Sequence, residues 1–132
     1  MTEVLSSRVL LHPADFAQSL RFYRETLGLA VYREWGTEGA PGHGIVFFLG
    51  GGYLELSGRS QATPGDKLEL WLQVRSADET HRALAETGVT VDEPPTDKPW
   101  GLREMRIRDP DGVRIVVVQV PDDHPLRHRP EA

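Results

Sequence analysis

The sequence predicts an α+β fold made of two tandem βαβββ modules, and three observations support it. Its 132 residues suffice for one ordinary domain, or for two very small units that share a core. Thirteen glycines and ten prolines indicate many turns, which suit short strands better than a helical bundle. The same order of expected elements occurs twice. Four identical pairs, each 61 positions apart, mark this repeat: Arg21 and Arg82, Glu25 and Glu86, Thr26 and Thr87, Gly51 and Gly112.

The first module is expected at residues 1–57. Its first strand, 7–12, stops at Pro13, because proline cannot donate a hydrogen bond to a strand ladder. A helix over 15–27 follows and ends at Gly28, a typical C-terminal stop. Its apolar face is formed by residues at three- and four-residue spacing: Phe16, Leu20, Tyr23 and Leu27. Three further strands complete the module: 29–35, 44–49 and 53–57.

The second module is expected at residues 68–120, after a polar linker at 58–67 that contains proline and glycine. Its helix is predicted over 77–87. Its strands are predicted at 68–74, 89–91, 102–108 and 113–120, with a proline-rich loop at 92–101. The remaining residues, 121–132, show no apolar periodicity and are interpreted as a mobile tail.

Composition excludes several classes of function. The formal net charge of -5 has the wrong sign for a non-specific nucleic-acid binder. The absence of cysteine removes thiol catalysis and cysteine metal sites. The longest apolar run, 45–49, is far shorter than the ~20 residues that span a bilayer as a helix. No basic segment followed by an apolar core opens the sequence. We therefore expect a cytoplasmic protein that binds neither nucleic acid nor membrane.

Alternate residues of a strand share a face, so each strand can be sorted into two sets. In strand 68–74 one set is aliphatic, and the other is mixed: Glu69, Trp71 and Gln73. In strand 53–57 the corresponding mixed set is Tyr53, Glu55 and Ser57, and the first strand contributes Arg8, Leu10 and His12. Solvent exposure explains a single Glu or Gln. A tryptophan between two polar residues is more typical of a ligand groove or a protein interface.

Three sequence segments make the chain resemble the vicinal oxygen chelate superfamily. They are Asp15-x-x-x-Ser19-x-x-Phe22-Tyr23, then Leu27-Gly28-Leu29, and Asp109-Pro110-Asp111-Gly112 before the last strand. That family contains glyoxalase I, extradiol dioxygenases, fosfomycin-resistance enzymes and bleomycin-resistance proteins. The resemblance implies a curved, eight-stranded mixed sheet with the helices on its outer face. It leaves the reaction open, because one scaffold carries several chemistries.

In metal-dependent members, His or Glu side chains from both modules meet at one divalent ion. The resemblance places these four positions at Arg8, Glu55, Glu69 and Val116. A guanidinium has no lone pair to give to a metal, and valine has no donor atom. We therefore expect neither a metal nor another cofactor. Arg8 is expected to pair with Glu55 or Glu69, either to read a ligand or only to fill the former metal site.

Trp35 and Trp100 lie in or beside loops at similar places of the two modules. They are expected either to stack on a ligand at the mouth of the groove or to anchor their loops against the core or a partner chain. Among the five histidines, His12 shares a face with Arg8, and His43 lies in a glycine-rich loop from which it could reach the groove. A histidine at such a place is more often only a partly exposed polar residue.

The leading hypothesis is a metal-independent protein that binds a small, partly aromatic molecule, as the resemblance to bleomycin-resistance proteins implies. The expected ligand-binding residues are Arg8, Trp35, Phe47, Tyr53, Glu55, Glu69, Trp71, Gln73, Trp100 and Val116. The alternative is an enzyme of the glyoxalase or dioxygenase type. It would use Glu55 or Glu69 as a general base with a raised pKa, or a metal held at other positions. A regulatory or assembly module without a small ligand is the third possibility. The resemblance also implies a homodimer.

Overall fold

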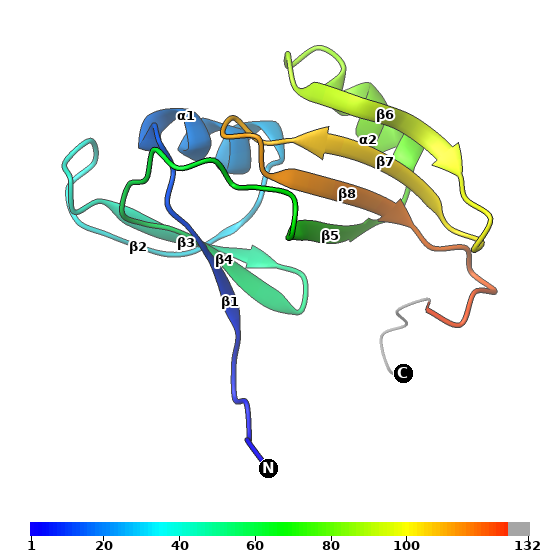
Figure 1. The fold of residues 1–132 in the computed structure, drawn as a ribbon, viewed down its shortest axis with the longest axis horizontal. Helices are drawn as coiled ribbons and strands as arrows, with labels where there is room; N and C mark the ends of the chain where they lie inside the picture. The colour runs from blue at the N-terminus through cyan, green and yellow to red at the C-terminus, as the bar shows by residue number, and fades with distance from the viewer. Residues whose placement is uncertain (127–132) are drawn as a thin grey trace. The chain divides into compact units, whose positions relative to one another are not determined.

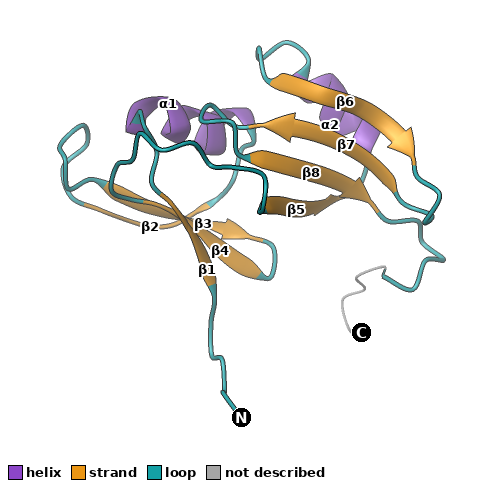
Figure 2. Cartoon of the chain, in the orientation of Figure 1, coloured by secondary structure: helices purple, strands orange, loops and turns teal. Residues whose placement is uncertain are grey.

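The computed structural model describes residues 1–126, so residues 127–132 of the expected tail lie outside the described part of the chain. The described residues form two compact units, divided between Pro64 and Gly65. Each unit contains one α-helix and a four-stranded mixed sheet (Figures 1 and 2). The predicted α+β fold of two tandem βαβββ modules is therefore confirmed.

In unit 1, the strands lie in the order β1-β4-β3-β2, with β1 parallel to β4 and the other pairs antiparallel. The strands are β1 (Arg8–Leu11), β2 (Val31–Trp35), β3 (Gly44–Leu49) and β4 (Gly52–Leu56). Helix α1 (Phe16–Arg21) packs on one side of this sheet, which we call the helix face; the other side is the helix-free face. The core of unit 1 lies on the helix face and includes Phe16, Leu20, Tyr23, Leu54 and Leu56.

The predicted helix over 15–27 is divided into α1 and a π-helical segment, η1 (Phe22–Thr26). The Asp15 carboxylate accepts a hydrogen bond from the amide of Gln18 and starts α1. In η1, the Leu27 amide donates to the Phe22 carbonyl at 2.8 Å, which closes a wider turn. Phe22 and Tyr23 are both buried. The wider turn thus places two consecutive aromatic residues in the core, which a period of 3.6 residues does not predict.

Unit 2 repeats this arrangement, with the strand order β5-β8-β7-β6 and β5 parallel to β8. Its elements are β5 (Glu69–Val74), α2 (Ala77–Leu84), β6 (Thr90–Asp97), β7 (Arg103–Arg108) and β8 (Arg114–Gln119). Strand β6 is longer than the predicted strand at 89–91 and includes two prolines that we expected in a loop. An edge strand tolerates proline because one side of its backbone needs no partner, and β6 lies at the edge with two irregularities in its register.

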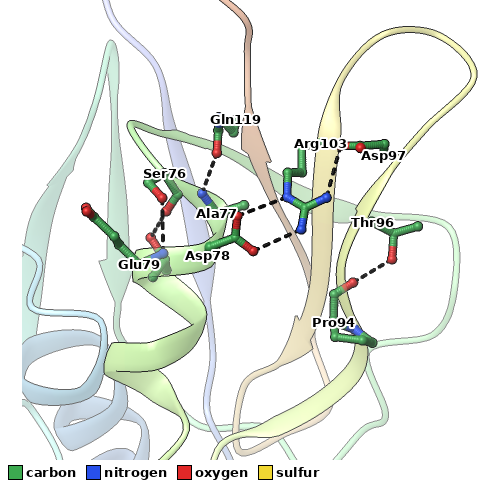
Figure 3. A network of polar contacts seen from close by, with 10 residues as sticks. Ser76, Ala77, Asp78, Glu79, Pro94, Thr96, Asp97, Arg103 and Gln119 are labelled. Atoms are coloured by element: carbon green, nitrogen blue, oxygen red, sulfur yellow. Dashed lines mark hydrogen bonds and ion pairs between the residues drawn. The ribbon is translucent and has the colours of Figure 1, made fainter.

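A polar network fastens α2 to its sheet (Figure 3). The Ser76 hydroxyl accepts a hydrogen bond from the Glu79 amide at 3.1 Å and caps the helix. The Arg103 guanidinium donates to both carboxylate oxygens of Asp78, at 3.0 and 3.2 Å, and to Asp97 at 3.0 Å. Arg103 of β7 therefore lies on the helix face of unit 2 and joins the helix to β6.

No helix of residues 1–126 is long and apolar enough to cross a membrane.

The β3-β4 hairpin decides which aromatic residue lies on which face. Leu49 pairs with Gly52, so only Gly50 and Gly51 form the turn, and Gly50 has a φ of 59° that favours glycine. Phe48 then lies opposite Tyr53, and Phe47 lies opposite Leu54. Phe47 is therefore on the helix face, fully buried, with its ring 6.4 Å from that of Tyr23. The expectation that Phe47 contacts a ligand is corrected: Phe48 occupies the helix-free face.

This register can be tested by comparing Phe47→Ala with Phe48→Ala. Phe47→Ala is expected to lower the free energy of unfolding by about 3–5 kcal/mol, because it empties a core site. Phe48→Ala removes only contacts between exposed rings and is expected to cost about 1 kcal/mol. Urea denaturation followed by circular dichroism measures both values. Equal losses, or the reverse order, would contradict the register.

Candidate functional site

On the helix-free face of unit 1, an arginine and a carboxylate form a close pair. Strands β1 and β4 are neighbours, and Arg8 Nη1 lies 2.8 Å from Glu55 Oε1. The second oxygen, Glu55 Oε2, accepts a hydrogen bond from the Ser57 hydroxyl at 2.6 Å. The Glu55 side chain is only 12% exposed, whereas that of Arg8 is 36% exposed. Arg8 therefore pairs with Glu55, one of the two partners, Glu55 and Glu69, that the sequence analysis expected.

These contacts stabilise the charged form of Glu55. The hydrogen bond from Ser57 lowers the pKa of the Glu55 carboxyl most, and the hydrogen bond and positive charge of Arg8 lower it further, against the opposing effect of burial. The enzyme hypothesis expected a general base whose pKa is raised. For Glu55 that expectation is wrong, because both carboxylate oxygens accept hydrogen bonds. A carboxylate held in this way is a weak base and a good fixed hydrogen-bond acceptor.

Unit 2 has its own pair, between Glu69 of β5 and Arg106 of β7. Arg106 Nη1 lies 2.8 Å from Glu69 Oε2, and Arg106 Nη2 lies 3.8 Å from Glu104 Oε1. Glu104 also accepts a hydrogen bond from Trp100 Nε1 at 2.7 Å. The sequence did not reveal which face of strand 102–108 turns inward, because Arg103, Arg106 and Arg108 do not alternate cleanly. Arg106 was therefore not selected as a site residue. The fully buried apolar residues of β7, Met105 and Ile107, mark its helix face and would have placed Arg106 on the other face.

Val116 pairs with Trp71 on one side and with Arg106 on the other. Its side chain is 3% exposed and belongs to a buried apolar cluster on the helix-free face of unit 2. The other members of this cluster are Leu102, Val118 and Val120. Val116 therefore supports this face and offers no exposed area for a ligand. Its expected role as a ligand contact is corrected.

Of the four positions that the family resemblance assigns to a metal, only Glu55 and Glu69 carry donor atoms. Arg8 and Val116 offer no lone pair to a cation. Glu55 and Glu69 are carboxylates, but each is already paired with an arginine of its own unit. Within residues 1–126, no group of three or more His, Cys, Asp or Glu side chains is placed to hold a metal ion. The residues present at these positions do not fit a divalent ion.

Three aromatic rings gather on the helix-free face of unit 1: Tyr32 of β2, Phe48 of β3 and Tyr53 of β4. Their ring centroids are 4.9 to 5.8 Å apart. Tyr32 and Phe48 are 49% and 44% exposed. The sequence analysis selected only Tyr53. The two-residue turn places Phe48 beside it, and Tyr32 lies at an irregularity of the β2-β3 register that no alternation of side chains reveals. We call these three residues the aromatic cluster.

The three tryptophans occupy different environments. The Trp35 indole lies so close to Gly44 that a Cβ there would overlap it, and the Arg33 guanidinium lies 5.4 Å from the centre of the Trp35 ring. Trp71 is 48% exposed between two exposed polar residues, Glu69 and Gln73. Trp100 is 56% exposed and anchored through Glu104. Trp71 and Trp100 therefore have ring surface that a ligand can reach.

His43 does not reach the helix-free face. Its ring is buried, 4.7 Å from the Phe16 ring, and Nε2 lies 2.5 Å from Glu34 Oε2. The hydrogen bond with His43 is the main cause that lowers the pKa of Glu34. A hollow of about 590 Å³ lies beside α1, lined by residues that include Phe16, Arg21, His43 and Arg59. The idea that His43 reaches the groove is corrected: it is a core histidine of unit 1.

Comparisons with known proteins agree with this fold. The model of the Glyoxalase/Bleomycin resistance protein/Dioxygenase superfamily matches residues 7–117. A member of that superfamily from Sphaerobacter thermophilus is similar in structure, with 27% identity, a TM-score of 0.68, and coverage of 89% of this chain and 98% of that one. No curated protein matches the sequence.

Two further proteins, TnmS3 and TioX, are similar to this chain in structure. TnmS3, an antibiotic binding protein from Streptomyces sp. CB03234, is 26% identical, with a TM-score of 0.73 and coverage of 92% of this chain and 99% of that chain. TioX from Micromonospora sp. ML1 is 19% identical, with a TM-score of 0.72 and coverage of 88% and 98%. At that identity, the likeness to TioX shows the fold alone.

The lowered pKa of Glu55 predicts a pH dependence of stability. A carboxyl whose pKa is lower in the folded chain contributes stability above its ordinary pKa, and this contribution is lost as the pH falls through the lowered value. The wild type is therefore expected to exceed Glu55→Gln in stability at about pH 7, by an amount that shrinks below the ordinary glutamate pKa near 4.3. Urea denaturation of both proteins between about pH 3 and pH 7 measures this difference in the free energy of unfolding. A difference that grows on acidification would contradict the ion pair.

Proposed function

Because the chain belongs to the Glyoxalase/Bleomycin resistance protein/Dioxygenase superfamily, we propose that it binds a small, partly aromatic molecule on its helix-free faces, without a coordinated metal. One observation carries the proposal: the aromatic cluster is exposed beside an arginine-carboxylate pair that is fixed in place. Contiguous exposed apolar surface of this kind marks a binding site in a soluble protein. Ring surface and a few oriented polar groups together are typical of small-molecule sites.

The aromatic cluster provides stacking surface. Its rings already contact one another, so little side-chain freedom remains to be lost when a flat ligand is placed on them. Each ring that stacks on a ligand contributes about 0.5–1.5 kcal/mol beyond its buried area. Trp35 is proposed to add ring surface on unit 1, and Trp71 and Trp100 are proposed to provide ring surface on unit 2.

Polar recognition is assigned to the two arginine-carboxylate pairs. Arg8 uses Nη1 for Glu55, and Arg106 uses Nη1 for Glu69. A guanidinium carries five N–H donors, so each arginine retains donors for oxygen acceptors of a ligand. The exposed amide of Gln73 can donate and accept on the same face of unit 2.

The similarity to TnmS3 supports a ligand of the antibiotic type, because that protein is an antibiotic binding protein. The donor atoms at the four family positions support binding without a metal, since only two carboxylates remain there and both are paired with arginine. The lowered pKa of Glu55 speaks against proton abstraction by that residue. Sequestration of a ligand requires no such step.

We further propose that the chain forms a homodimer. Strand β1 is an edge strand of its sheet, and its apolar residue Val9, on the helix face, is 40% exposed. An exposed apolar edge strand is a surface that proteins generally cover, because its free backbone groups pair readily with another chain.

Titration with a panel of antibiotics and aromatic metabolites tests the binding function. At least one planar compound is expected to quench tryptophan fluorescence. Tyr32→Ala and Phe48→Ala are each expected to raise its dissociation constant by about two- to tenfold, the equivalent of one stacked ring. Leu5→Ala, at an apolar residue that is 87% exposed, is the control and should leave the constant unchanged.

Two results would count against the proposal. One is a fluorescence signal that no compound of the panel changes. The other is turnover of any compound by the wild type, which would favour the enzyme alternative.

A further inference from the structure

His12 follows β1 in unit 1, and one of its ring nitrogens is fixed. Nδ1 lies 2.6 Å from the backbone carbonyl oxygen of Ser57. A carbonyl oxygen can only accept, so Nδ1 carries the proton of this hydrogen bond. In the neutral ring, Nε2 then has the lone pair and is a hydrogen-bond acceptor. The residue is exposed, so this acceptor is available to a ligand.

The position of His12 is on the same side as the Arg8-Glu55 pair. Arg8, Leu10 and His12 alternate along the chain, and Leu10 pairs with Glu55 in the register. Ser57, which holds His12 through its carbonyl, also holds Glu55 through its hydroxyl.

His12, the Arg8-Glu55 pair and the aromatic cluster form a strip on the helix-free face of unit 1, along its edge strand β1 and the neighbouring β4. The aromatic cluster lies at one end, at Tyr53, and His12 lies at the other, at Ser57. Ser57 directly follows β4 and is four residue steps from Tyr53, a distance of about 13 Å at about 3.3 Å per step. Between them lie the Arg8-Glu55 pair and the exposed side chain of Leu10. A flat molecule of several fused rings can extend along this strip.

The hydrogen-bond acceptors of the strip differ in how many hydrogen bonds they already accept within the protein. Each oxygen of Glu55 already accepts one hydrogen bond, from Arg8 or from Ser57. Among residues 1–126, Nε2 of His12 accepts no hydrogen bond, and the ring is held through Nδ1. A ligand hydroxyl that reaches this end of the strip therefore finds an oriented acceptor.

We infer that the ligand class is a hydroxylated polycyclic aromatic compound, whose hydroxyl donates a hydrogen bond to His12 Nε2 while its rings stack on the aromatic cluster. This inference rests on the proposed binding function and assigns its ligand class. His12 then determines specificity: a methyl ether of the same skeleton keeps the stacking surface but has no proton to donate.

The test compares a hydroxyphenanthrene with the corresponding methoxyphenanthrene on the full chain. Fluorescence anisotropy of each compound gives its dissociation constant, at about pH 8, where imidazole is ordinarily neutral. The wild type is expected to bind the hydroxyl compound about three- to tenfold more tightly, as one neutral hydrogen bond provides. Both His12→Ala and His12→Asn are expected to reduce this ratio to about one.

His12→Asn separates recognition from structure. The asparagine amide can still donate to the Ser57 carbonyl, as Nδ1 does, but it provides no acceptor in the place of Nε2. His81→Ala, on α2 of the other unit, is the matched control and should keep the wild-type ratio.

Three results would overturn the inference. If the wild type binds both compounds equally, or if His12→Asn keeps the preference, His12 does not read a hydroxyl and the binding function itself stands. If the wild type binds neither compound, the assigned ligand class is wrong. In that case the binding function is decided by the broader panel alone.

Discussion

The pairing of each helix-free-face glutamate with an arginine is the interaction on which the site depends. Glu55 is 12% exposed, and a carboxylate so far removed from water needs a positive partner or hydrogen-bond donors. A divalent ion at these positions would supply that charge. Here Arg8 supplies it to Glu55, and Arg106 supplies it to Glu69. Because a guanidinium is always charged, the positive partner of each carboxylate does not depend on pH.

This substitution changes what the scaffold can do. A metal ion polarises a bound oxygen and activates it for reaction, whereas an arginine only donates hydrogen bonds. The hydrogen bonds from Ser57 and Arg8 lower the pKa of Glu55, which weakens it as a base. What remains is a set of oriented donors and acceptors beside exposed rings. Such a set suits recognition of a ligand more than its conversion.

Sequence predicted the elements governed by local rules. The repeat and the glycine predicted to end the first helix follow from patterns along the chain, and the family resemblance implied the pairing of Arg8 with a glutamate. Four features did not. The choice between Phe47 and Phe48 depends on the length of one turn, because a shift of one residue reverses the face. The π-helical turn and the long edge strand β6 depend on packing and edge position. The position of the Arg106 side chain depends on its hydrogen bond to Glu69, which is 37 residues away in the chain.

Metal analysis tests most directly whether arginine has replaced the ion. The protein is purified without chelators, and its content of Fe, Mn, Ni and Zn is measured by mass spectrometry. The account predicts far less than one ion per chain for each metal. About one ion per chain, lost on substitution of Glu55 or Glu69 by alanine, would contradict it.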